Sequence, residues 1–152
     1  MKTFRILLPL SVLFALLAAC NGSRQLAATG KDAKHALKVT RVPDFTRPEN
    51  HRPVTIEDWT LEGDIAKLAI SYSGGCGEHS FNAFFDGKYM KSLPPRAGIF
   101  IQHNHGEDNC RKLIMDTLYI DLAEIRYNAN AGSVIVGFDG SDKTLEYSYK
   151  AK

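Results

Sequence analysis

Cysteine, tryptophan and helical periodicity are all scarce in this 152-residue sequence. It contains three cysteines and one tryptophan. Only residues 121–127 could form one or two helical turns, because no other stretch repeats apolar residues at the period of a helix. The Gly-x-Ser-x-Gly, phosphate-binding-loop and His-Glu-x-x-His patterns that mark several enzyme classes are absent. The sequence therefore favours a protein that is not an enzyme.

An apolar run long enough to cross a membrane comfortably, about 20 residues, is also missing. A shorter apolar run, residues 6–17, follows a brief basic head and leads into Leu17-Ala18-Ala19-Cys20. Small residues before a cysteine are typical of a bacterial lipoprotein cleavage site. We therefore expect residues 1–19 to be a lipoprotein signal peptide and Cys20 to carry the lipid, which would anchor a soluble domain to a membrane.

The mature chain would have no net charge. The formal charge of +2 comes from Lys2 and Arg5, and 17 basic and 17 acidic residues remain after the signal peptide. This balance gives no reason to expect nucleic acid as a partner. The expected partner is the membrane, through the N-terminal lipid anchor. A protein partner of unknown identity is left open. Asn21, in place of an aspartate after Cys20, favours the outer membrane. The lack of an acidic run there favours its periplasmic side.

Residues 20–35 are small and polar and predict a flexible tether, and residues 36–152 predict a single domain. Alternating apolar residues indicate short strands near 38–42, 54–61, 65–72, 81–85, 99–103, 113–122, 134–138 and 145–149. The predicted fold is all-β, an antiparallel, immunoglobulin-like β-sandwich of seven or eight short strands. A small barrel is the alternative.

Two cysteines remain once Cys20 has received its lipid. An exported domain favours a disulfide between Cys76 and Cys110, which would close a loop of about 35 residues and contribute roughly 4 kcal/mol. The glycines around Cys76 would let the backbone turn tightly there.

A metal site is the alternative use of the same segments. Cys76, His79, His103, His105 and Cys110 offer up to five nitrogen and sulfur ligands, which would suit zinc, and copper is conceivable. A third interpretation is a small hydrolytic or thiol-dependent enzyme with Cys76 as nucleophile and a histidine as base. Asp108 and Asn109 could instead bind loop amides. With the disulfide interpretation preferred, we predict no catalytic residue, metal or cofactor.

Most aromatic residues lie on alternating strands and are expected in the core. Phe84 and Phe100 lie on the opposite face of their strands. If both were exposed and adjacent, they would form a partner-binding patch.

Three segments resemble the NigD-like family of bacterial envelope lipoproteins. They are Tyr72-Ser73-Gly74-Gly75-Cys76-Gly77-Glu78-His79-Ser80-Phe81, His103 seven residues before Cys110, and Thr117-Leu118-Tyr119-Ile120-Asp121-Leu122. The resemblance covers about residues 60–150. It implies a C-terminal β-sandwich domain and an immunity-related role in the cell envelope. The chain has too few residues before that region for the extra N-terminal domain of longer family members.

Overall fold

The computed structural model describes residues 35–48 and 51–151. The expected signal peptide, the lipid attachment at Cys20 and nearly all of the expected tether lie outside the described residues. Within the described ranges, no helix is long and apolar enough to cross a membrane.

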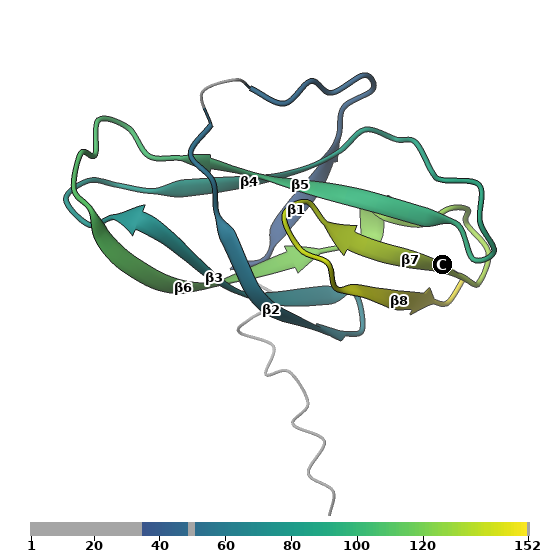
Figure 1. The fold of residues 1–152 in the computed structure, drawn as a ribbon. Helices are drawn as coiled ribbons and strands as arrows, with labels where there is room; N and C mark the ends of the chain where they lie inside the picture. Colours follow the sequence, from purple (N-terminus) through teal and green to yellow (C-terminus); the bar gives the residue numbers. More distant parts are fainter. Residues whose placement is uncertain (1–34, 49–50, 152) are drawn as a thin grey trace, which may run out of the picture.

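Eight strands and one short 3₁₀ helix lie wholly within the described residues (Figure 1), which confirms the predicted all-β class. The elements are β1 (Leu37–Arg41), β2 (Thr55–Glu62), β3 (Ile65–Gly74), β4 (Ser80–Phe85), β5 (Arg96–Asn104), β6 (Lys112–Asp121), η2 (Ala123–Ile125), β7 (Gly132–Phe138) and β8 (Thr144–Tyr149). Their positions follow the alternation of apolar side chains, because every second residue of a strand points to the same face.

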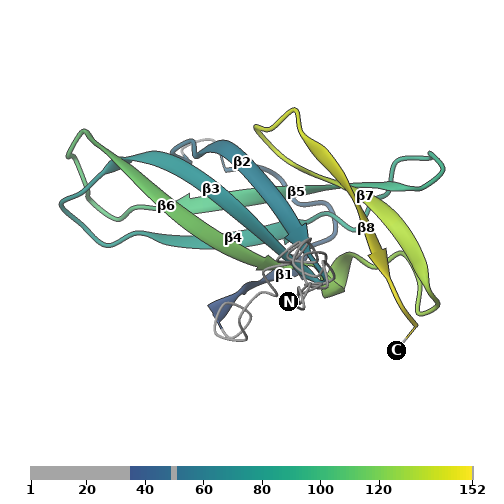
Figure 2. The same ribbon diagram turned by 90° about the horizontal axis from the view of Figure 1, so that it is seen from below.

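The strands belong to one continuous sheet in the order β2-β3-β6-β1-β4-β5-β7-β8. The expectation of an antiparallel, immunoglobulin-like sandwich is wrong in this respect. β1 pairs in parallel with both β4 and β6, and β5 pairs in parallel with β7. Because β1 joins the β2-β3-β6 layer to the β4-β5 layer, the two layers form a single curled sheet (Figures 1 and 2).

The two edge strands of the sheet approach each other, so the sheet is a nearly closed barrel. The indole Nε1 of Trp59, on β2, donates a hydrogen bond of 3.4 Å to the carbonyl oxygen of Lys143, next to β8. The ammonium group of Lys143 lies 2.6 Å from the carboxylate of Asp58. These contacts hold β2 beside the turn that leads into β8.

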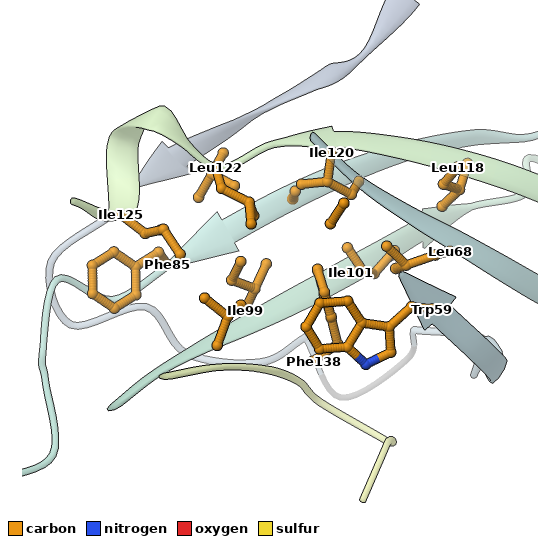
Figure 3. Close-up of a cluster of buried hydrophobic side chains, with 14 of the residues drawn as sticks. Trp59, Leu68, Phe85, Ile99, Ile101, Leu118, Ile120, Leu122, Ile125 and Phe138 are labelled. Atoms are coloured by element: carbon orange, nitrogen blue, oxygen red, sulfur yellow. The ribbon is translucent and has the colours of Figure 1, made fainter. Parts of the chain in front are cut away.

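The hydrophobic core lies inside the curled sheet (Figure 3). Trp59 packs edge-on against Phe138, with ring centroids 4.9 Å apart. Around them, Leu68, Ile99 and Ile120 are fully buried. Because a fully buried side chain of this size contributes about 1.5–3 kcal/mol, this cluster supplies much of the driving force for folding.

Phe84 and Phe100 do not form an exposed patch. They are directly opposite each other on β4 and β5, as their alternation requires. Phe45 and His51, from the segment between β1 and β2, lie against these rings with centroid distances of 5.0–5.2 Å, and Phe100 is only 8% exposed. The predicted docking patch was therefore wrong, because a proline-rich connection covers it.

Candidate functional site

The two segments that the sequence marked as important lie at the same end of the sheet. β3 pairs with β6 from Ile65 to Gly74, and β4 pairs with β5 so that Ser80 is opposite Asn104. The loop between β3 and β4 and the loop between β5 and β6 are therefore neighbours.

A disulfide joins the two loops between Cys76 and Cys110, whose Cα atoms are 5.8 Å apart. Cys76 is exposed and Cys110 is partly buried. With both sulfurs in this bond, neither is a thiolate that could attack a substrate or bind a metal.

Asp108 is the centre of the polar contacts at this end. Its side chain is completely buried, and its Oδ2 accepts hydrogen bonds from the backbone amides of Gly75 (2.7 Å), Cys76 (2.9 Å) and Gly77 (3.1 Å). Its Oδ1 accepts a 2.8 Å hydrogen bond from the amide of Cys110. One carboxylate thus binds the backbone on both sides of the disulfide.

The environment of Asp108 favours its charged form. The amide of Cys76, then that of Cys110, hold the pKa of this carboxyl far below its usual range, and burial opposes them only in part. A carboxylate that accepts several backbone N–H bonds is stabilised as the anion. Asp108 is therefore a fixed negative charge inside the loop pair.

The glycine-rich turn before β4 fits closely around these groups. A Cβ atom added to Gly74 would lie 2.5 Å from the ring of His79, and one added to Gly77 would lie 3.1 Å from Asp108. Gly75 has a φ of +109°, which favours glycine. The glycines therefore allow the amides to approach the carboxylate.

His79 connects Asp108 to His103. Its Nε2 lies 2.9 Å from Oδ2 of Asp108, and its Nδ1 lies 2.8 Å from Nε2 of His103. Because Asp108 is an anion, Nε2 of His79 carries a proton and donates a hydrogen bond to Oδ2 of Asp108. When His79 carries only this proton, its Nδ1 accepts from His103, which leaves the Nδ1 of His103 as a bare lone pair.

His103 lies among aromatic rings inside the sheet and is 2% exposed. Its ring stacks on Phe81 with a centroid distance of 4.9 Å, and Tyr72 lies 4.7 Å away. Burial, followed by the neighbouring His79 and His105, lowers the pKa of His103 to about 4. The imidazole is therefore neutral near pH 7.

Two ring nitrogens at this site lack a hydrogen-bond partner among the residues that the structure describes. They are Nδ1 of His103 and Nδ1 of His105, and both atoms are buried. The two rings are 5.9 Å apart and nearly perpendicular. Buried polar atoms are usually satisfied, so these two mark the place where a water or another ligand would bind.

All five residues of the expected metal set are gathered at this end, but their contacts differ. Both sulfurs are in the disulfide, and both nitrogens of His79 are hydrogen-bonded. Of the five residues, His103 and His105 alone therefore have an unpartnered ring nitrogen.

The sequence did not indicate that Asp108 would be the central residue of this site. Its role as an acceptor for loop amides was one alternative, and the signal was an aspartate beside a run of glycines whose amides need an acceptor.

These features define an all-β domain with eight strands and a disulfide-closed, histidine-bearing end. No protein-family profile and no curated protein sequence matches the chain. Its fold is similar to the crystal structure of a NigD-like immunity protein from Bacteroides caccae, with 14% sequence identity and a TM-score of 0.53 over 77% of this chain and 64% of that one. The similarity to the NigD-like family is thus confirmed at the level of the fold.

Two other crystal structures share weaker similarity. One is of a toxin-related protein from Parabacteroides distasonis, with 13% identity and a TM-score of 0.48. The other is of a protein of unknown function from Bacteroides vulgatus, with 16% identity and a TM-score of 0.46. Both alignments cover 77% of this chain, and 62% and 58% of the other chains. The chain therefore spans less than two thirds of the length of each of the three structures.

Proposed function

We propose that this chain is a lipid-anchored protein of the bacterial cell envelope with an immunity-type role, which it performs by binding and without catalysis. The observation that carries this proposal is the shared fold with a NigD-like immunity protein. The disulfide and the buried Asp108 support it further. Two loops joined by a disulfide suit a domain that works outside the cytoplasm, where disulfides persist.

The immunity role can be tested without knowing the toxin. The gene is deleted from the source bacterium, and the deletion strain is grown together with its parent, which would still make any toxin. We expect the parent to inhibit the deletion strain and a plasmid copy of the gene to restore its growth. Equal growth of the two strains in co-culture would contradict the immunity role.

The lipid anchor at Cys20 needs a separate test. We expect the full chain to enter the detergent phase in a Triton X-114 separation and to fractionate with the outer membrane. Cys20→Ser, which removes the acceptor thiol, should leave the chain in the aqueous phase and should fail to restore growth in the co-culture. Detergent partitioning of Cys20→Ser like the unchanged protein would contradict lipidation at this residue.

A second candidate function is the binding of zinc or copper through His103 and His105. The specific observation in its favour is the pair of buried, unpartnered Nδ1 atoms. His103 also has the support that a metal-binding histidine usually has, because its other nitrogen is hydrogen-bonded to His79, which in turn binds the carboxylate of Asp108. Such a chain fixes the ring and its tautomer.

Calorimetric titration of the purified full chain with zinc and with copper tests this candidate. We expect His103→Gln and His105→Gln each to abolish saturable binding. His35→Gln, an exposed histidine just before β1, is the matched control and should leave binding unchanged. Equal binding by all three variants would show that the metal binds elsewhere.

A further inference from the structure

The edge of β6 that faces away from β3 is open over most of its length. β3 pairs with β6 along all of Lys112–Asp121, whereas β1 pairs only with Ile120 and Asp121. No other strand of the described chain pairs with residues 112–119. Figure 2 shows β6 as the outermost strand of the β2-β3-β6 layer. An open edge of this kind presents backbone N–H and C=O groups that another strand can bind.

Two apolar side chains stand on the outer face of this open strand. Leu113 is 68% exposed and Met115 is 73% exposed. They are directly opposite Ser73 and Ser71 of β3, whose small side chains leave the two apolar groups prominent. Exposed apolar side chains beside an unpaired edge are typical of a surface that a partner covers.

The charges of the same strand are arranged symmetrically about Ile114. Lys112 lies two residues before Ile114 and Asp116 two residues after it, and both are exposed. In an antiparallel pair of two β6 strands with Ile114 opposite Ile114, each Lys112 would lie opposite Asp116. In the same register Leu113 would lie opposite Met115, so that both the charges and the apolar groups would match.

Neighbouring registers do not match in this way. A two-fold axis at Leu113 would place Asp116 opposite Cys110, and an axis at Met115 would place Ile114 opposite Asp116. An axis at Asp116 would place two carboxylates together. Opposite charges directly across two strands are stabilising and like charges destabilising, so the axis at Ile114 is the favoured one.

We propose that β6 is a homodimer interface, in which residues 111–117 of two copies pair antiparallel about a two-fold axis at Ile114. The interface is isologous, because each copy supplies the same strand. It extends the β2-β3-β6 layer of one copy into that of the other.

Cysteine cross-linking of the full chain in intact cells tests the register. Residues directly opposite on antiparallel strands have Cα atoms about 4.5–5.5 Å apart, which suits a disulfide. We expect Ile114→Cys to give a dimer on a non-reducing gel. Met115→Cys is the matched control: its position is more exposed, but in this register it faces Leu113, so it should give several times less dimer. Equal or greater yield from Met115→Cys, or attachment of Ile114→Cys to a different protein, would overturn the proposal.

Charge exchange tests the same contact without a new cysteine. Lys112→Asp places like charges together twice in each dimer, and we expect it to weaken dimerisation about tenfold in analytical ultracentrifugation of the full chain in detergent. Lys112→Asp combined with Asp116→Lys should restore the dimer, and Lys91→Asp should leave it unchanged. Circular dichroism checks that each variant is folded. A double variant as weak as Lys112→Asp alone, or a wild-type chain that is monomeric throughout, would overturn the proposal.

Discussion

His79 and His103 share a hydrogen bond of 2.8 Å between their ring nitrogens, and only the far side of His79 reaches a charged group, Asp108. Two imidazoles in such contact cannot both be protonated without placing two N–H groups against each other. The pair therefore couples the protonation of the buried His103 ring to the stability of the two disulfide-linked loops.

Acidification should destabilise the domain through His103. Its folded-state pKa of about 4 lies below the ordinary value of 6.5, so between these pH values the unfolded chain binds a proton that the folded chain does not. Stability then falls as the pH decreases through this window and levels off below it, with a slope of up to about 1.4 kcal/mol per pH unit for one proton. Urea unfolding from pH 7.5 to 4.5 measures the slope. His103→Gln should reduce this slope, and an unchanged slope in that variant would contradict the assignment.

Asp108→Asn should destabilise the domain more than any exposed carboxylate substitution. The asparagine amide group would face backbone N–H groups that now donate to a carboxylate. Because the folded-state pKa of Asp108 is lowered, its contribution is present above about pH 4 and is lost as the pH falls further. Thermal unfolding at pH 7 should therefore separate wild type from variant clearly, and the gap should narrow below pH 4.

The exposed neighbour Glu107 supplies the matched control for Asp108. Glu107→Gln should change the free energy of unfolding by less than about 0.5 kcal/mol at any of these pH values. Equal effects of the two substitutions would mean that the amide contacts of Asp108 contribute little.

Removing the disulfide should cost about 4 kcal/mol, because the bond closes a loop between residues 34 positions apart. The double variant Cys76→Ala, Cys110→Ala isolates this effect, and urea unfolding with and without reductant measures it. Reductant should destabilise the wild-type chain by a similar amount and leave the double variant unchanged. Before reduction, alkylation should label neither cysteine; a labelled Cys76 would show that the bond does not form.

Trp59→Ala should lower the free energy of unfolding by about 3–5 kcal/mol, as removal of a large buried aromatic ring usually does. The indole is 1% exposed, packs on Phe138 and binds the Lys143 carbonyl. Since Trp59 is the single tryptophan, its fluorescence reports on this junction between the two sheet edges. Lys143→Ala, which keeps the backbone carbonyl, should leave the emission maximum unchanged; a red shift would mean that the Lys143 side chain maintains the burial of Trp59.

The strands could be predicted because each has its own alternation, and the 3₁₀ turn at Ala123–Ile125 falls inside the predicted helical stretch. The sheet order could not be predicted in the same way. Nothing in the five residues of β1 indicates that they pair in parallel with strands about 45 and 80 residues away. The partners on the two edges of so short a strand are chosen by the rest of the fold.

The candidate site, too, could be predicted from the sequence only in part. Cysteine count and the expected export predict the disulfide partners, and the histidines were expected near them. The hydrogen-bonded order Asp108, His79, His103 depends on how two loops approach in space, which spacing along the chain does not determine. Phe100 was misjudged for the same reason, because its cover comes from Phe45 and His51, far from it in the sequence.

The position of β1 also constrains the order in which the domain can assemble. The first strand of the described residues, β1, lies in the middle of the sheet, and its pairing with β6 requires Ile120 to be present. Contacts that join distant parts of a chain form slowly, since the intervening segment must be closed first. A chain that emerges N-terminus first therefore cannot pair β1 with β6 until about four fifths of it is available, and it cannot complete the sheet before β8. Until then the β2-β3 and β4-β5 hairpins can form, but no strand joins the two layers to each other.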